Sequence, residues 1–160
     1  MSEQKKYDKI EDAIIELLEG ELQENALKFA AYLNENQLTP NMSEWGYIPF
    51  NGYRLGWMQV EGKDKWLLEI FNFLKFDEFN DDDEEFTKVV HHHVRFCDDS
   101  HGGCWGAKDV KIFGKEFTNV CSQHSRAFVN PDSNTIEHIK KLIEYSKKTK
   151  PYKQQYHSNP

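Results

Sequence analysis

The residues best suited to chemistry lie in one stretch, residues 97–124, which holds all three cysteines of the chain. The cysteines are Cys97, Cys104 and Cys121, and His101 and His124 lie in the same stretch. Thiolate sulfur and imidazole nitrogen are suitable zinc ligands, and four protein ligands in a tetrahedron form a closed, structural site. The hypothesis is therefore a zinc site formed by the three cysteines with either His101 or His124.

A predicted hairpin explains how these residues come together. Residues 110–113 and 116–120 are short runs rich in β-branched and aromatic side chains, and Gly114 with Lys115 suits a two-residue type II′ turn between them. The predicted pairs across this turn are Phe113–Glu116, Ile112–Phe117 and Val110–Asn119. Extending this register places Cys121 opposite about Lys108, beside the loop that joins Cys97 to Cys104.

Two other interpretations of the cysteines compete with zinc. In the first, the cysteines are three ordinary thiols near a core, since cysteine outside disulfides is often buried as a small apolar side chain. The spacing is a partial match to metal-binding patterns, because six residues separate Cys97 from Cys104 and only two separate Cys121 from His124. A disulfide fits less well, because the cysteine count is odd and the N-terminus carries no secretory signal.

Other reactive side chains have simpler explanations. Consecutive helical positions point about 100° apart, so His91, His92 and His93 cannot easily chelate one ion. The acidic run at residues 77–85 lacks the spacing of a calcium-binding loop and is better explained as the start of a helix, where negative charge is favourable. A cysteine–histidine nucleophile pair, Cys121 with His124 or Cys104 with His101, stays open as an alternative.

Composition limits the class of protein. Its 160 residues predict a single domain, 1–160, with about 8–149 ordered and flexible ends at the N-terminus and at 150–160. The hydrophobic fraction of 38% and the aromatic fraction of 14% argue against general disorder. No apolar run approaches the roughly 20 residues of a membrane helix, so we expect no membrane insertion. The net charge of −7 argues against nucleic acid as a partner.

The hydrophobic pattern predicts an α+β fold. Apolar residues recur at helical spacing over residues 10–18 and 22–33, with Gly20 between the two runs. Alternating and continuous apolar runs at 47–50, 53–61 and 65–73 predict a small antiparallel sheet. A middle helix is expected over 82–96 and a short strand at 126–129. Asn130 as N-cap with Pro131 in the first turn predicts a last helix that runs to Lys148.

A resemblance adds to this interpretation. The segments YIPFNGYRLGW (residues 47–57), IFGKEFTNVC (112–121) and FVNPD (128–132) are similar to those of a family of small uncharacterised clostridial (Firmicutes) proteins with a cysteine-bearing loop before an IFGKEF-type hairpin. The resemblance covers roughly residues 47–148 and implies a cytoplasmic bacterial protein with an α+β fold, but no known activity. That family has a further cysteine where this chain has Ser100, which is followed by His101.

Three functions are compatible with these features. The first is a binding module for a small molecule, with a structural zinc site and a cleft that Trp45, Trp57, Trp66 and Trp105 line. The second is a protein-interaction or immunity-type partner, whose acidic surface suits a basic target. The third is a zinc- or thiol-dependent enzyme, which requires an open metal position or an activated cysteine.

Overall fold

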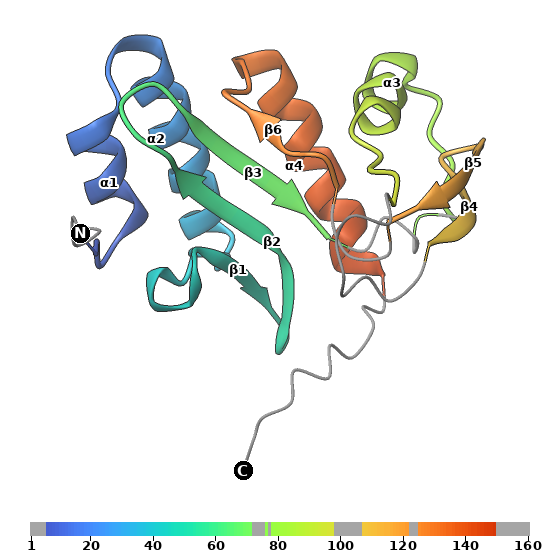
Figure 1. Ribbon diagram of the computed structural model, residues 1–160, viewed down its shortest axis with the longest axis horizontal. Helices are drawn as coiled ribbons and strands as arrows, with labels where there is room; N and C mark the ends of the chain where they lie inside the picture. The colour runs from blue at the N-terminus through green and yellow to red at the C-terminus, as the bar shows by residue number, and fades with distance from the viewer. Residues whose placement is uncertain (1–5, 72–75, 77, 98–106, 122–124, 150–160) are drawn as a thin grey trace.

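The computed structural model shows the predicted α+β fold with a C-terminal helix (Figure 1). It describes residues 6–71, 76, 78–97, 107–121 and 125–149, so 1–5 and the predicted flexible tail at 150–160 lie outside. The helices are α1 (Ile10–Leu17), α2 (Gly20–Glu35), the short 3-10 helix η1 (Met42–Glu44), α3 (Glu84–His92) and α4 (Ser133–Lys148). The strands are β1 (Tyr47–Phe50), β2 (Tyr53–Val60), β3 (Trp66–Ile70), β4 (Lys108–Ile112), β5 (Lys115–Val120) and β6 (Phe128–Val129).

Helices α1 and α2 confirm the two predicted amphipathic runs. Gly20 has a φ of 59°, and this conformation, which glycine adopts without steric cost, turns the chain from one helix into the next. The apolar stripes are buried and form part of one core. Their buried members include Ile10, Ala13, Ile14, Ala26, Phe29, Ala30 and Leu33.

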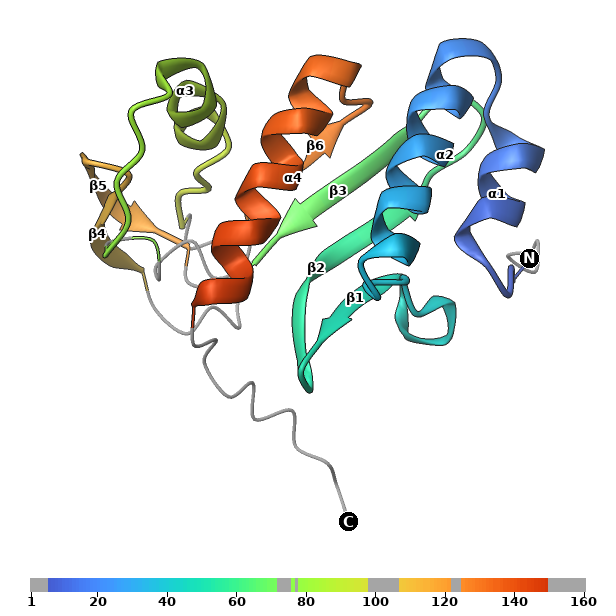
Figure 2. The same ribbon diagram turned by 180° about the vertical axis from the view of Figure 1, so that it is seen from behind.

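The main sheet is antiparallel throughout, with the strand order β1-β2-β3-β6. β1 lies at its edge, where Pro49 is tolerated because one side of the strand needs no partner. Helices α1, α2 and α4 cover one face of this sheet, as the two opposite views show (Figures 1 and 2). No helix covers the other face within the part of the chain that the structure describes.

Strand β3 is buried on both faces, as its continuous apolar sequence predicts. Trp66, Leu68 and Ile70 belong to the core under the helices. On the opposite side, Leu67 is 6% exposed and Phe71, just past the strand end, is 2% exposed. The helix-free face of the sheet is therefore apolar near β3.

Helix α3 is shorter than the predicted 82–96 helix. The predicted start of the helix is right to within two residues. Asp83 is the N-cap, and its side chain accepts a hydrogen bond from the backbone N–H of Phe86 at 3.1 Å. Its C-cap is His93, so the prediction is wrong for the last turn. The chain beyond His93 is extended, and Phe96 pairs with Val120 of β5. This pairing gives the backbone of residues 95–97 hydrogen-bond partners outside the helix.

Helix α4 begins two residues later than predicted. Asp132 is its N-cap, and its carboxylate accepts a hydrogen bond from the N–H of Thr135 at 2.7 Å. Asn130 instead has a φ of 46°, and its side chain is occupied by β3. Its Oδ1 accepts from the N–H of Trp66, and its Nδ2 donates to the carbonyl of Asp64, each at 2.9 Å. The predicted N-cap therefore joins α4 to the sheet.

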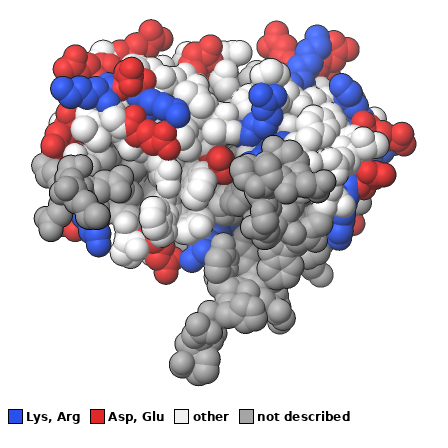
Figure 3. Space-filling model, in the orientation of Figure 1, with Lys and Arg blue, Asp and Glu red and all other residues white. Residues whose placement is uncertain are grey.

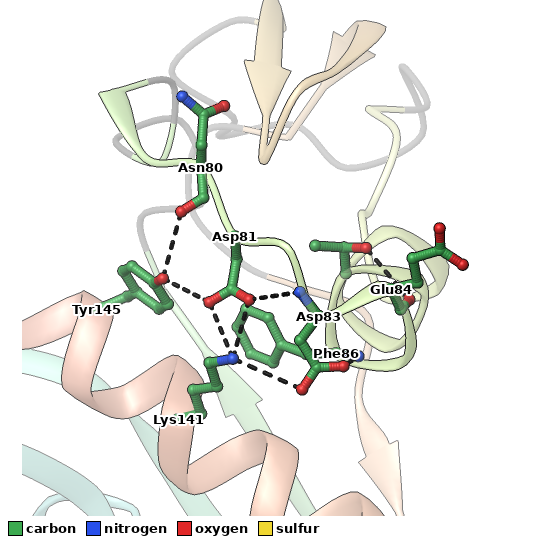
Figure 4. A network of polar contacts seen from close by, with 8 residues as sticks. Asn80, Asp81, Asp83, Glu84, Phe86, Lys141 and Tyr145 are labelled. Atoms are coloured by element: carbon green, nitrogen blue, oxygen red, sulfur yellow. Dashed lines mark hydrogen bonds and ion pairs between the residues drawn. The ribbon is translucent and has the colours of Figure 1, made fainter.

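A polar network fixes the start of α3 against α4 (Figure 4). Lys141 Nζ lies 2.9 Å from Asp81 Oδ2 and 3.6 Å from Asp83 Oδ2. The hydroxyl of Tyr145 donates to Asp81 at 2.6 Å. Burial opposes ionisation of Asp81, but the hydrogen bonds from Tyr145 and Lys141 outweigh it and lower the pKa of this carboxyl. Burial and the bond to Asp81 raise the pKa of Tyr145 to about 12.

Replacing Tyr145 with phenylalanine tests this network. Tyr145→Phe should lower the free energy of unfolding at pH 7 by about 1–2 kcal/mol, because a largely buried carboxylate loses a donor. The ionised Asp81 stabilises the fold fully above its unfolded pKa, and this contribution is lost as the pH falls through the lowered folded pKa. Urea unfolding should therefore show the full difference at pH 7 and a smaller one as the pH falls below about 4.

Tyr32→Phe is the matched control, since the Tyr32 hydroxyl donates to a surface carboxylate, that of Glu144, at 3.4 Å. We expect it to cost well under about 1 kcal/mol. Equal losses in the two variants would show that the Asp81 network does not stabilise the junction of α3 and α4.

Candidate metal centre

The β4–β5 hairpin sets the position of Cys121, but with a different turn from the one predicted. Ile112 faces Lys115, so the turn consists of Phe113 and Gly114. Their φ values are 44° and 84°. Two positive φ values are typical of a type I′ turn. The predicted turn at Gly114 and Lys115 is thus wrong by one residue. The predicted pairs are wrong by two residues of β5, since Val110 faces Phe117 and Ile112 faces Lys115.

Burial of Phe113 explains this turn. A positive φ costs an aromatic residue about 1–2 kcal/mol. Phe113 is only 6% exposed. The centroid of its ring lies 5.6 Å from that of Phe76, 5.2 Å from that of Phe86 and 4.9 Å from that of Tyr145. Burying an aromatic side chain contributes about 1.5–3 kcal/mol, enough to offset the strained backbone. The hairpin tip is therefore anchored between α3 and α4.

Main-chain pairing brings Cys97 and Cys121 onto neighbouring extended segments. The N–H of Cys97 donates to the carbonyl of Asn119 at 2.8 Å, and the N–H of Cys121 donates to the carbonyl of Arg95 at 2.7 Å. The cysteines therefore flank the Phe96–Val120 pair diagonally. Successive residues of a strand point to opposite faces, so both cysteines lie on the face opposite the Phe96–Val120 pair.

The diagonal arrangement disfavours a direct disulfide between Cys97 and Cys121. Diagonal neighbours across an antiparallel pair are about 7–8 Å apart. A direct disulfide between Cys97 and Cys121 needs Cα atoms within about 7 Å. Two thiolates on one zinc need sulfurs within about 4 Å of each other. Cys121 is 8% exposed and Cys97 is half-buried, so this pair lies at the rim of the core.

The other predicted ligands, Cys104, His101 and His124, lie outside the described residues. Within the described ranges, no group of three or more His, Cys, Asp or Glu residues could hold a metal ion. Cys97 and Cys121 are thus the two described members of the hypothesised set, and the zinc site stays a prediction. The predicted position of Cys121 opposite about Lys108 is nearly right, because Lys108 faces the preceding residue, Val120.

The three consecutive histidines point in different directions, as predicted. The Nε2–H of His91 donates to the carbonyl of Ile112 at 2.7 Å and ties α3 to the hairpin. The Nδ1–H of His93 donates to the carbonyl of Val89 at 2.8 Å, and its ring stacks on Phe128 at 3.7 Å. His92 is exposed. The contacts of His91 and His93 join α3 to the hairpin and to β6.

Acid should weaken the fold through His93. Burial lowers the pKa of His93 from 6.5, despite the hydrogen bond to Val89. The unfolded chain therefore takes up a proton first, and stability declines as the pH falls below about 6.5 toward the lowered folded pKa. Urea midpoints measured between pH 7.5 and pH 5 should show this decline, and His93→Gln should reduce its slope. The exposed His92→Gln is the control, and equal slopes in the two variants would contradict the prediction.

The four tryptophans do not line one cleft. Trp66 is fully buried in the core under the helices, and Trp45 is 73% exposed. Trp57 lies on the helix-free face of the sheet, opposite Glu69 of β3. Trp105 lies outside the described residues. The prediction that all four line one cleft is therefore wrong, since Trp66 and Trp57 lie on opposite faces of the main sheet.

Trp57 instead belongs to an aromatic cluster that the tryptophan count alone did not reveal. Its ring centroid lies 5.8 Å from Tyr47 and 6.2 Å from Phe71. The guanidinium of Arg54 lies 3.9 Å from the centroid of the Tyr47 ring. We call Tyr47, Trp57 and Phe71 the aromatic cluster. Alternation along β1 and β2 was the signal that could have found it, since Tyr47 and Trp57 are directly paired.

No protein-family model, curated protein or solved structure matches this chain. The resemblance to clostridial proteins therefore stays a prediction. In the described part of the chain, no helix has the length and apolar character needed to cross a bilayer.

Proposed function

We propose that this chain is a small ligand-binding domain that a structural zinc ion stabilises. Cys97 and Cys121 hold the ion together with Cys104 and either His101 or His124. The observation that carries the proposal is the Phe96–Val120 pairing, which holds two cysteines distant in sequence on one face of a short antiparallel ladder. The donor set suits zinc, because thiolate and imidazole are its common structural ligands.

Four protein ligands leave no position for an activated water, so the role of the zinc is structural. It would fix the segment that follows α3 to the end of β5. Binding requires deprotonated thiols and a neutral imidazole, so it should release protons and weaken below about pH 6.

The aromatic cluster is the proposed ligand-binding surface. Tyr47 and Trp57 are half-buried on the helix-free face, and Arg54 and Gln59 add polar groups beside them. A space-filling view of this side shows charged side chains mainly around its rim (Figure 3). An apolar surface with a few polar groups suits a small molecule with an apolar body.

A second candidate function is a protein-interaction partner, and Trp45 favours it. This side chain is 73% exposed although its backbone has a φ of 61°, an unusual conformation for a bulky residue. Tryptophan is enriched among the residues that dominate protein interfaces. The net charge of −7 would suit a basic partner.

Metal analysis tests the zinc proposal. Protein purified without added metal should contain one zinc per chain, and Cys97→Ser and Cys121→Ser should each lower zinc content and thermal stability together. Val120→Ala is the control, because it removes buried apolar volume beside Cys121 and leaves every thiol in place. Zinc-free wild-type protein that also fails to bind added zinc would contradict the proposal.

The indole signals in nuclear magnetic resonance spectra distinguish the two candidate functions. A library of small aromatic carboxylic acids should shift the Trp57 indole signal, and Arg54→Ala should weaken the shift. Shifts confined to Trp45, or none at all, would contradict binding at the aromatic cluster.

A further inference from the structure

One asparagine bonds to both backbone polar groups of Cys97. The carbonyl of Asn119 accepts from the Cys97 N–H at 2.8 Å, and the side-chain Nδ2 of Asn119 donates to the Cys97 carbonyl at 2.7 Å. In a regular ladder the backbone N–H of Asn119 would bond to that carbonyl. Here a φ of 59° turns this N–H toward Asp109, whose Oδ1 accepts it at 3.0 Å. The side-chain amide therefore replaces the missing backbone donor.

Few residues can act in this way. Asparagine tolerates a positive φ better than most residues, and its amide supplies a donor at short reach. Aspartate fits the same space but cannot donate, and glycine keeps the backbone conformation but has no side chain. The match between the conformation and the donor explains why asparagine stands at the bulge between β4 and β5.

The position of Asn119 links the two cysteines. It precedes Cys121 by two residues, and its side chain and carbonyl hold the backbone of Cys97. Asn119 therefore fixes the Cys97 side of this pairing, while the bond from the Cys121 N–H to the carbonyl of Arg95 fixes the other side. Partners that orient metal ligands in this way typically change metal affinity by 10–100-fold when they are removed.

We propose that Asn119 is the positioning residue that sets Cys97 against Cys121 for metal binding. This inference rests on the proposed zinc site. Asn119 is exposed, so its replacement should affect the fold little, whereas it should change the geometry of the two thiols. Asp109 supports it by holding the backbone N–H that the positive φ turns outward.

The test measures zinc and cobalt binding by wild-type protein, Asn119→Gly and Asn119→Asp. Zinc affinity should fall about 10–100-fold in both variants. The thiolate-to-cobalt absorption should weaken or change shape, while the unfolding temperature of the metal-free proteins should change little. The cobalt spectrum reports the ligands directly, so a general loss of stability would not reproduce this result.

Asn130→Gly is the matched control. Asn130 also has a positive φ and bridges two segments through its side chain, but it joins β3 to α4 instead of holding a cysteine. It should lose stability and keep the wild-type zinc affinity. If Asn119→Gly does not fold, Asn119→Asp and Asp109→Ala carry the same test.

The possible failures can be told apart. Wild-type protein that binds neither metal overturns the proposed zinc site, and the positioning role with it. Wild-type protein that binds zinc, with Asn119 variants of equal affinity and unchanged cobalt spectra, overturns the positioning role alone.

Discussion

Val90→Asp should destabilise the protein by about 3–5 kcal/mol, because it places an unpaired charge in the core. Val90 is 1% exposed on the inner face of α3, and it belongs to the same core as Phe86 and Ile139. Urea unfolding followed by circular dichroism should show the loss, and a marginally stable domain would not stay folded.

Val129→Asp is the control for this substitution. Val129 is 50% exposed on β6, so the same chemical change leaves the new carboxylate in water. It should cost about 1 kcal/mol or less. If Val90→Asp unfolds at the same urea concentration as wild-type protein, α3 does not pack by the face that the structure shows.

Gly56→Ala should destabilise the protein about as much as Val90→Asp, because β2 and β3 lie too close together at Gly56 to admit a side chain. A Cβ at this position would lie 2.0 Å from the carbonyl oxygen of Glu69 and 3.1 Å from its carbon. These are backbone atoms of the paired strand and cannot rotate away. The strands must separate where Gly56 faces Ile70, and we expect a loss of about 3 kcal/mol or more in urea unfolding.

Gly62→Ala separates this crowding from the cost of backbone conformation. Gly62 has a φ of 76° in the β2–β3 turn, but a Cβ there would meet nothing within 4 Å. Its replacement should cost about 1–2 kcal/mol, from the positive φ alone. A Gly56→Ala variant that is more stable than Gly62→Ala would mean that β2 and β3 are not as close as described.

Periodic segments could be predicted from the sequence because burial of one face decides their structure. The stripes of α1, α2 and α4 and the two apolar faces of β3 each follow directly from residue spacing. Long-range contacts decide the local structure elsewhere. Phe113 has poor turn propensity, yet it occupies the turn because its ring is buried against residues that are distant in sequence.

The ends of α3 and α4 were mispredicted for a related reason. Asn130 has the sequence signature of an N-cap, but its side chain bonds to Asp64 and Trp66, so Asp132 caps α4 instead. The helical periodicity up to residue 96 does not reveal that β5 offers a pairing partner to residues 95–97. Local sequence cannot distinguish these outcomes, because the competing partner is more than twenty residues away.

The candidate site could be predicted in part. The spacing indicated that Cys121 returns near Cys97, and the structure places both on neighbouring segments. The cause differs from the predicted one. Pairing of residues 95–97 with β5 brings the two cysteines together, whereas the prediction relied on the register of the β4–β5 hairpin. Asn119 had no signal in the sequence, because its role depends on a positive φ at a β-bulge.

The zinc proposal is tested most directly by a crystal structure of the zinc-loaded protein with anomalous scattering at the zinc edge. The proposal predicts one zinc with the sulfurs of Cys97 and Cys121 each about 2.3 Å away, and therefore within about 4 Å of each other. A well-ordered structure with these two sulfurs more than about 8 Å apart would contradict it, because one zinc cannot bind both.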